Sequence, residues 1–433
     1  MGKKPILMEK YFNPGFKTKP GVHVGSQSVK FFQGNPREQT WEGFHLAGAF
    51  NGDVIVVRDL DPNYVTYWNN FTRDLTIINL SGADKGKFLT EIILKDKHAI
   101  NLIKKKMEPD SKLMVSHPTN LEQKLAEALN IPLHGSPRIS ELYGTKSGIR
   151  HLAKEFNLQM PPGFICSTYS QVEKAISILQ HSFDEIVIKH NLSLSGYFSK
   201  KIKAIDNRDL KVLVDEVCGG QFSEGKDIVV VEGWLRSKTS LCAHIEILEG
   251  KEPIICSAWQ QIIDSDGISY MGASPLMISE KAFDSFLRQV WKLAFALKEK
   301  GAIGSFGPDF LITGGKETNL ERDTSVLLEL NARAPYTAYP LQLIKNIKGN
   351  IGNGFYTKHI KLKHRLNFVE IRKILETNNL LITRKSRKAS GVIPHNIGLL
   401  PWKLFDILAI GNSWEETINI MEKIDLIFDQ KRA

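Results

Sequence analysis

The segment VLLELNAR, residues 326–333, places three polar side chains at alternate positions of a short apolar run. Because successive side chains of a β-strand point to opposite faces, Glu329, Asn331 and Arg333 are expected to share one face. Carboxylate and amide oxygens are ligands that Mg²⁺ prefers, and a guanidinium suits an anionic oxygen beside the metal. The alternative is a solvated strand edge, which seldom carries this combination. The segment therefore predicts a magnesium site next to an anionic substrate.

The segment GSFGPDFLIT, residues 304–313, predicts the partner of that strand. Asp309 is the one acidic residue of this run and lies 20 residues before Glu329. Taken alone, Asp309 is more typical of a turn or a helix cap. With a hairpin-like connection over residues 314–325, it can lie on the neighbouring strand and supply a second metal carboxylate. Two metal ions that bridge phosphates recur in phosphoryl transfer, so we expect two Mg²⁺ ions, with Mn²⁺ as the alternative.

A third segment, EIVIKHNLSLSGYFSKK at residues 185–201, carries groups suited to phosphate. Lys189 ends a β-branched strand, and Gly196 lies in the polar loop that follows. The lysine can meet a phosphate as a point charge, and backbone N–H groups around the loop can cradle further phosphate oxygens. Considered alone, a lysine that reaches past apolar surface to water is the commoner explanation.

A fourth segment, DIVVVEGWLR at residues 227–236, carries groups suited to a nucleotide base. An apolar strand ends at Glu232 and continues into Trp234 and Leu235. A carboxylate and backbone groups at such a strand end can pair with the amino edge of adenine. Considered alone, Glu232 is more simply explained as an exposed strand terminus. The four segments are therefore informative together rather than singly.

The composition is that of a folded protein with several domains. Of the 433 residues, 42% are hydrophobic and 24% are charged, and the length corresponds to about three domains of average size. The net charge of +10 favours an anionic ligand or partner. The four cysteines form no CxxC pair, so a zinc ribbon, a thioredoxin motif and a disulfide framework are not expected. No signal peptide or membrane-spanning run is recognised, and we expect a soluble cytoplasmic protein.

The first part of the chain predicts an α/β domain. Residues 1–50 are rich in Gly, Pro and aromatic residues and are expected to form an irregular arm. From residue 53 onward, short strands alternate with helices, and a helix at 121–129 has Asn120 as its expected N-cap. Alternation of strands and helices is typical of a doubly wound parallel sheet. We therefore assign residues 1–140 to this arm and a small Rossmann-like domain.

The remaining chain predicts two further domains. In residues 141–355, antiparallel strands dominate and helices are few, which indicates an α+β body. Residues 356–433 are assigned to a small C-terminal domain with a basic helical stretch and a terminal helix. That stretch, 358–388, contains ten basic and two acidic residues. A solvated helix face is the default explanation, and the functional one is a dock for an acidic substrate or an acidic carrier protein.

In this order, the four polar segments resemble the ATP-grasp family: a lysine strand, a glycine loop, a Glu-x-x-Leu hinge, and Asp followed by Glu-x-Asn-x-Arg. The likeness covers about residues 141–340 and implies a two-lobed ATP-grasp body after a pre-ATP-grasp domain. It also implies ATP and Mg²⁺ as cofactors. The residues that it implicates are Lys146, Lys189 and Gly196 for the phosphates, Glu232, Trp234 and Leu235 for the adenine, Asp309, Glu329 and Asn331 for Mg²⁺, and Arg333 for the acyl phosphate and the tetrahedral state after it.

A narrower likeness covers most of the chain. The segments GSPRISELYGTKSGIRHLAKE (135–155), ELNARAPYTAYPLQL (329–343) and GVIPHNIGLLP (391–401) are similar to the peptide ligases of the pheganomycin biosynthetic type. That group has a pre-ATP-grasp domain and a C-terminal domain of its own. The resemblance implies peptide-type bond formation in natural-product, antibiotic or peptide biosynthesis.

The function implied is an ATP-dependent carboxylate–amine ligase. A small-molecule carboxylate attacks the γ-phosphate of ATP and gives an acyl phosphate and ADP, and an amino acid or peptide amine then displaces phosphate. A thiol acceptor, or loading of an amino acid onto an acidic acyl carrier protein, stays open. A nucleic-acid-binding protein is the alternative of another class, but residues 358–388 hold almost no aromatic side chains for base stacking. A nucleotide-binding remnant without catalysis is disfavoured because the polar residues of 309–333 are intact.

Overall fold

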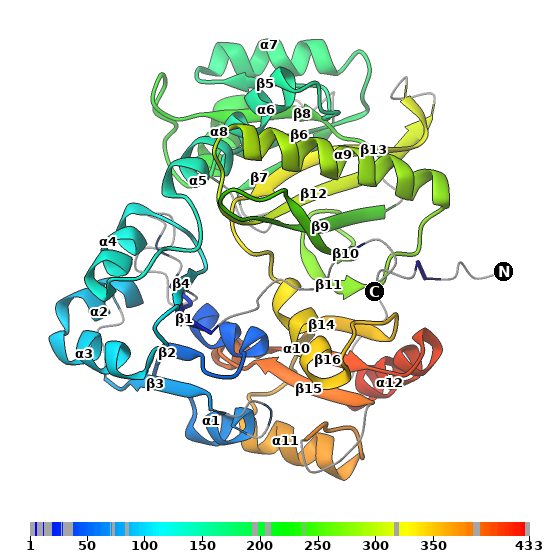
Figure 1. The fold of residues 1–433 in the computed structure, drawn as a ribbon. Coiled ribbons are helices and arrows are strands. Elements are labelled where there is room, and N and C mark those ends of the chain that lie inside the picture. The colour runs from blue at the N-terminus through cyan, green and yellow to red at the C-terminus, as the bar shows by residue number, and fades with distance from the viewer. Residues whose placement is uncertain are drawn as a thin grey trace.

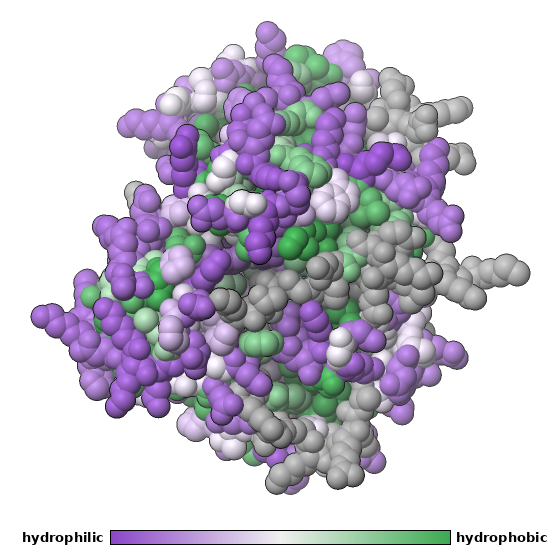
Figure 2. All heavy atoms as spheres, in the orientation of Figure 1, coloured by the Kyte–Doolittle hydropathy of each residue, from purple (hydrophilic) through white to green (hydrophobic). Residues whose placement is uncertain are grey.

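The computed structural model contains three β-sheets with helices packed on them (Figure 1). It describes residues 5–6, 12, 20–26, 28, 38–69, 71, 74–82, 86–192, 198–203, 209–236, 239–315, 320–383 and 390–428. Within this part of the chain, no helix combines the length and the apolar character needed to cross a bilayer. On the face shown in Figure 2, hydrophilic side chains cover most of the described surface.

The N-terminal sheet is parallel and has the strand order β3-β2-β1-β4. Its elements are β1 (Gly21–Val24), β2 (Val54–Arg58), α1 (Pro62–Trp68), β3 (Thr76–Leu80), α2 (Leu89–Lys95), α3 (Lys97–Lys106), β4 (Lys112–Val115) and α4 (Asn120–Leu129). Strand β2 is a continuous apolar run because both of its faces are buried. Val54 and Val56 pack with helices α2 to α4, whereas Ile55 and Val57 join the main core. The predicted Rossmann-like sheet is confirmed.

Two expectations for this part of the chain are wrong. The segment expected to be an irregular arm supplies β1, the strand between β2 and β4, and the 3₁₀ helix η3 (Glu38–Gly48). A strand of four residues is too short to give a periodic signal in the sequence. The N-cap of α4 is Thr119 rather than Asn120, since the Thr119 hydroxyl accepts a hydrogen bond from the backbone N–H of Leu121.

The small antiparallel sheet forms an upper lobe in Figure 1, with the strand order β5-β8-β6-β7. Its elements are β5 (Gly163–Cys166), α7 (Tyr169–Leu179), β6 (Glu185–His190), β7 (Ser199–Lys203), α8 (Leu210–Cys218) and β8 (Val229–Gly233). Ile186, Ile188 and Val231 pack with α7 and α8 in one core. Because strand residues alternate between faces, Lys189 and Glu232 project from the opposite face.

The largest sheet has eight strands in the order β13-β12-β9-β10-β11-β14-β16-β15. Its first part comprises β9 (Thr239–Ile247), β10 (Ile254–Ile263), β11 (Tyr270–Ser274), α9 (Glu280–Glu299), β12 (Gly304–Gly315), β13 (Leu320–Asn331) and α10 (Ala338–Lys348). Strands β12 and β13 form the predicted hairpin and place Asp309 opposite Glu329. Because β13 ends at Asn331, Arg333 lies in the bend after the strand, and the prediction that it belongs to the strand is wrong.

The C-terminal segment extends the same sheet. It comprises β14 (Phe355–Lys361), α11 (Phe368–Thr377), β15 (Gly391–Asn396), the 3₁₀ helix η5 (Leu400–Trp402), β16 (Leu404–Ile410) and α12 (Trp414–Ile427). The expected basic helical stretch is helical only in part, since it begins within β14 and continues into α11. Lys358 is buried there and its Nζ lies 2.8 Å from Asp425. Arg372 pairs with Glu376 along α11, and the basic residues of 384–388 lie outside the described residues.

The junction between β11 and β14 depends on Gly272. A Cβ at this position would lie 1.9 Å from the carbonyl oxygen of Thr357 on β14. We expect Gly272→Ala to lower the free energy of unfolding by about 1–3 kcal/mol, because the backbones of two paired strands must separate. Urea unfolding followed by tryptophan fluorescence measures this change. Gly220→Ala is the matched control, since its Cβ would meet no heavy atom within 4 Å; equal stability of the two variants would contradict the prediction.

Candidate active site

Helix α6 (Lys146–Glu155) begins directly beside the end of β6. The backbone N–H of Lys146 donates to the carbonyl of Asn191 at 3.0 Å, and that of Ser147 donates to the Asn191 side chain at 2.9 Å. These bonds bring the two lysines predicted to hold phosphate, Lys146 and Lys189, to one place. Gly196, the third residue of that prediction, lies outside the described residues.

Each of the two lysines pairs with a carboxylate predicted for the same site. Lys146 Nζ lies 2.5 Å from Glu329 Oε2 on β13, and Lys189 Nζ lies 2.5 Å from Glu232 Oε2 on β8. The Lys146, Lys189 and Glu232 side chains are 14% exposed or less, so water screens these charges poorly. A phosphate that binds either lysine would therefore have to compete with a protein carboxylate.

The Glu232 carboxylate is held from two sides. Arg150 Nη2 lies 2.8 Å from Glu232 Oε1 and also donates to the carbonyl of Pro161. Burial opposes ionisation of Glu232, but Lys189 and Arg150 outweigh it and lower the pKa of Glu232 to about 2. Sequence reasoning missed Arg150, although its position four residues after Lys146 places both side chains on one face of a helix.

The other two residues predicted for the adenine follow β8. Trp234 donates its backbone N–H to the carbonyl of Glu185 at 2.9 Å, and its ring centroid lies 4.8 Å from Lys201 Nζ. Leu235 is buried. The carboxylate of Glu232 is already engaged by two cations, so its direct pairing with adenine stays a prediction, as do the roles of Trp234 and Leu235.

The three predicted metal ligands come together at the end of the β12–β13 hairpin. Asn331 Nδ2 donates to Asp309 Oδ2 at 3.0 Å, and Asp309 is the direct cross-strand neighbour of Glu329. Sequence reasoning missed Gln261 on β10, whose Nε2 donates to Asp309 Oδ1 at 2.9 Å. An amide inside an apolar strand was the available signal for Gln261.

The charges of this cluster fit a bound cation. Burial and the neighbouring Glu329 carboxylate raise the pKa of Asp309, whereas Lys146 outweighs burial and lowers the pKa of Glu329. Among the described residues, no group of three His, Cys, Asp or Glu side chains is arranged to hold a metal ion. Asp309, Glu329 and Asn331 offer hard oxygen ligands, and phosphate oxygens and water would have to complete an octahedral Mg²⁺ site.

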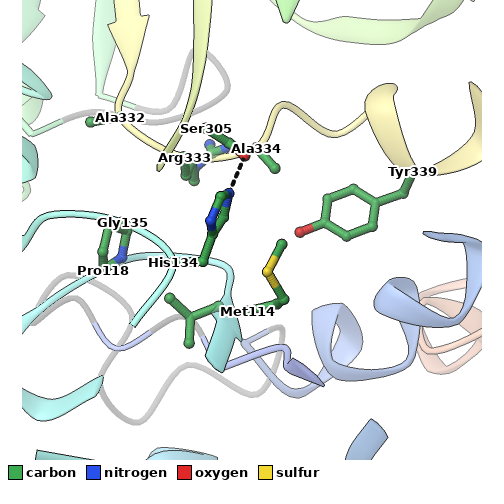
Figure 3. A pocket seen from close by; sticks show the side chains of 10 residues that line it. Met114, Pro118, His134, Gly135, Ser305, Ala332, Arg333, Ala334 and Tyr339 are labelled. Carbon is green, nitrogen blue, oxygen red and sulfur yellow. Dashed lines mark hydrogen bonds between the residues drawn. The ribbon is translucent and has the colours of Figure 1, made fainter. Parts of the chain in front are cut away.

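Arg333 connects this cluster with a small cavity (Figure 3). Its charge interacts with those of Asp309 and Glu329, and its Nε is buried without a hydrogen-bond partner among the described residues. The cavity lies beyond the carboxyl end of β4, at the edge where open α/β sheets bind ligands. Its lining residues are Met114, Val115, Pro118, His134, Gly135, Ser305, Ala332, Arg333, Ala334 and Tyr339.

The architecture matches solved structures over almost its whole length. N5-carboxyaminoimidazole synthetase from Staphylococcus aureus aligns with a TM-score of 0.57 and 13% identity, over 96% of this chain and 99% of that one. The chain has the ATP-grasp fold. Biotin carboxylase from Campylobacter jejuni aligns with a TM-score of 0.60 and 12% identity, over 96% of this chain and 92% of that one.

A third ATP-grasp structure extends the comparison. Phosphoribosylamine–glycine ligase from Thermotoga maritima aligns with a TM-score of 0.55 and 14% identity, over 94% of this chain and 96% of that one. No protein-family profile and no curated protein sequence matches this chain. The expected fold, a Rossmann-like domain before an ATP-grasp body, is therefore confirmed at the level of structure.

The pairing of Glu232 predicts an acid-sensitive contribution to stability. Its pKa is about 2 in the folded protein against 4.5 for an unperturbed glutamate. The contribution, on the order of 3 kcal/mol, is therefore present above about pH 4.5 and is lost as the pH falls through about 2. We expect Glu232→Gln to be destabilised at pH 7 and to approach the wild type at low pH, as measured by urea unfolding across this range.

Glu185→Gln is the matched control for that measurement. Glu185 lies 3.4 Å from Lys201, and both side chains are about one-third exposed. An ion pair of this exposure contributes no more than about 1 kcal/mol. A Glu232→Gln deficit that stays constant from pH 7 to pH 2 would contradict the charge assignment.

The metal cluster predicts that Glu329→Gln is inactive but folded. Replacing this anionic oxygen weakens the binding of Mg²⁺ and leaves the charge of the transferred phosphoryl group uncompensated. We expect ATP turnover to fall by roughly 10²–10³ while the thermal unfolding midpoint changes little. Glu173→Gln, on the exposed side of α7, is the control for loss of one carboxylate. Near-normal ADP production by folded Glu329→Gln would refute the metal assignment.

Proposed function

We propose that the protein is an ATP-dependent, ADP-forming carboxylate–amine ligase. The observation that carries this proposal is a cluster of two lysines and two carboxylates where α6 lies between the small and the large sheet. The N–O distance is 2.5 Å both between Lys146 and Glu329 and between Lys189 and Glu232. Neighbours of the same fold were solved with ATP, and with ADP and 5-aminoimidazole ribonucleotide. The two lysines and the carboxylates around them carry the charges that would bind a nucleoside triphosphate and its metal ion.

In this proposal, the lysines exchange their carboxylate partners for phosphate. Lys146 leaves Glu329 for a phosphate oxygen, and Lys189 does the same from Glu232. Asp309, Glu329 and Asn331 would hold Mg²⁺, which neutralises phosphate charge when it is bound. Gln261 and Asn331 keep the Asp309 carboxylate oriented through their amide groups. These residues position charge and do not require a covalent intermediate on the enzyme.

Arg333 acts where charge develops during transfer. Its guanidinium lies beyond the end of β13, between the metal cluster and the cavity, and can donate two parallel hydrogen bonds to an acyl phosphate or to the tetrahedral state after it. The buried and unpartnered Nε gives Arg333 a free donor among the described residues. We therefore assign Arg333 to the catalytic step rather than to the binding of ATP.

For the acceptor, we propose an amino acid or a peptide, following the resemblance to pheganomycin-type peptide ligases, with a role in natural-product or peptide biosynthesis. An amine acceptor is favoured over an acyl carrier protein or a nucleic acid. Among the described residues, the basic stretch that would dock an acidic partner is divided between a strand and a helix. Part of its charge is already paired, as Lys358 and Arg372 show.

A panel assay tests the proposed function. The full-length protein is incubated with ATP, Mg²⁺ and a panel of amino acids, dipeptides and simple aliphatic and aromatic acids. Hydroxylamine is added because it traps an acyl phosphate as a hydroxamate. ADP release and hydroxamate formation that both depend on a carboxylate would support the ligase. If the folded protein forms no hydroxamate with any member of the panel, the proposed ligase function is overturned.

The role of Arg333 predicts that its loss affects rate more than ATP affinity. Losing a donor to developing charge costs about 3–4 kcal/mol in the barrier, or roughly 10²–10³ in rate. Arg333→Lys keeps the charge but loses the planar fork, so we expect it to stay badly impaired, like Arg333→Ala. Calorimetric ATP dissociation constants are compared with turnover for both variants. A loss of ATP affinity in proportion to rate would identify Arg333 as a ground-state ligand instead.

A further inference from the structure

The cavity contains an imidazole that the ATP chemistry does not use. His134 lies where the polypeptide leaves the Rossmann-like domain, and its backbone N–H donates to the carbonyl of Leu113. A Cβ on Gly304, at the start of β12, would lie 2.7 Å from the Cα of Gly135. These two glycines therefore permit a close backbone approach that sets His134 against Ser305 in the cavity wall (Figure 3).

A hydrogen bond to Ser305, beside a buried carboxylate, fixes the orientation and the tautomer of His134. The Nε2 atom of His134 lies 3.1 Å from Glu246 Oε2 and 3.1 Å from Ser305 Oγ. The Ser305 hydroxyl donates its own hydrogen to Glu246, so its oxygen accepts from His134. The hydrogen of a neutral His134 is therefore on Nε2, and the lone pair is on Nδ1. Nδ1 has no hydrogen-bond partner within the part of the chain that the structure describes.

Glu246 is built to stay ionised in this position. It is 2% exposed, and His244, two residues away on β9, approaches its Oε1 at 3.0 Å. Burial opposes ionisation, but His134 and His244 outweigh it and lower the pKa of Glu246 to about 2. A carboxylate that remains charged can stabilise the imidazolium of His134 without taking up a proton itself.

Together these contacts form a general-base dyad beside Arg333. We infer that His134, oriented by Glu246, accepts the proton of the amine that attacks the acyl phosphate, and that the cavity receives the amino group of an amino-acid-like acceptor. This inference rests on the proposed ligase function. His134 is the catalytic residue of the dyad, since it lines the cavity and its Nδ1 has no hydrogen-bond partner among the described residues, and Glu246 is a positioning residue.

The proton balance of the step is complete. The acceptor arrives as an ammonium ion, R–NH₃⁺, and one N–H proton moves to Nδ1 of His134, which becomes an imidazolium. The amine lone pair forms the C–N bond, the bond between the acyl carbon and the phosphate oxygen breaks, and phosphate leaves. The second N–H proton is lost to the departing phosphate, and His134 returns its proton to water. The positive charge of Arg333 disfavours an ammonium ion in the same cavity, so deprotonation has to precede attack.

Other titratable groups near the dyad affect the pH dependence of the proposed proton transfer. The charged groups are Glu246 and Arg333, and the neutral groups are Tyr339 on α10, whose pKa is raised by burial, and His117 after β4, whose pKa is lowered by burial and by Arg333. The remaining groups are His244 on β9 and Cys256 on β10. Burial keeps Cys256 protonated, so among these groups the geometry favours His134 as the proton acceptor.

Two nucleophiles separate the role of His134 from a structural one. The panel supplies ammonium nucleophiles, whose attack needs a base, and hydroxylamine is already uncharged at neutral pH. We expect His134→Gln to lower amide formation by about 10²–10⁴ at pH 7, the usual contribution of general-base catalysis, and to leave hydroxamate formation within a few-fold of the wild type. Amide formation by the variant should recover as the pH is raised, because the amine then loses its proton to water.

Chemical rescue and a matched control complete the test. In His134→Ala, added imidazole should restore part of the amide-forming activity, which a merely structural contact could not produce. Glu246→Gln should show a smaller loss with the same selectivity for the amine reaction, and His98→Gln, exposed on α3, should show none. The inference is overturned if His134→Gln lowers hydroxamate and amide formation equally. It is also overturned if the variant lowers neither. No hydroxamate from the wild type would instead overturn the proposed function.

Discussion

The candidate site depends on the repulsion between the buried carboxylate of Asp309 and the partly exposed carboxylate of Glu329. The β12–β13 hairpin sets Asp309 directly opposite Glu329, and the burial of Asp309 leaves little water to screen its charge. The protein compensates with Lys146 from α6 and with Arg333 from the bend after β13. Even so, burial and the Glu329 carboxylate raise the pKa of Asp309. A divalent cation bound between the two carboxylates would relieve their repulsion.

Helix α6 connects the metal cluster on the large sheet with the small antiparallel sheet. Its Ile149 and Leu152 pack in the main core, while Lys146 pairs with β13 and Arg150 pairs with Glu232 on β8. One turn of a helix therefore contacts the metal cluster at one end and the strand predicted to face adenine at the other. In the proposed function, a nucleotide that draws Lys146 away from Glu329 would act on the same helix that holds Glu232 through Arg150.

The sequence predicts the components of the site better than their arrangement. Alternation along 326–333 identified Glu329 and Asn331, and the hairpin spacing identified Asp309 as their partner. The same alternation failed at Arg333, because β13 ends two residues earlier and a side chain beyond a strand end no longer follows its period. Register irregularities, such as the one between Asp309 and Phe310, are also invisible in a periodic pattern.

What the sequence could not reveal are contacts between distant segments. His134 and Glu246 are separated by more than 100 residues in the sequence. They come into contact only because the backbones at Gly135 and Gly304 approach closely in the fold. Arg150 and Gln261 escaped notice for the same reason, since each is ordinary within its own helix or strand. Strand β1 shows the opposite limit, because four residues carry too little pattern to be recognised before their neighbours in the sheet are known.

The C-terminal strands explain how the bend that carries Arg333 is held in place. Tyr336, three residues after Arg333, donates its hydroxyl to the buried Asp406 on β16. Asp406 also accepts from His359 on β14, and from Asn396 Nδ2 at 3.1 Å. A buried carboxylate that accepts three hydrogen bonds holds all three donor side chains in position. Displacing any one donor would leave part of a buried charge uncompensated. The bend therefore owes its position to strands that extend the sheet beyond Asp309, Glu329 and Asn331, and these strands orient Arg333 indirectly, through Tyr336.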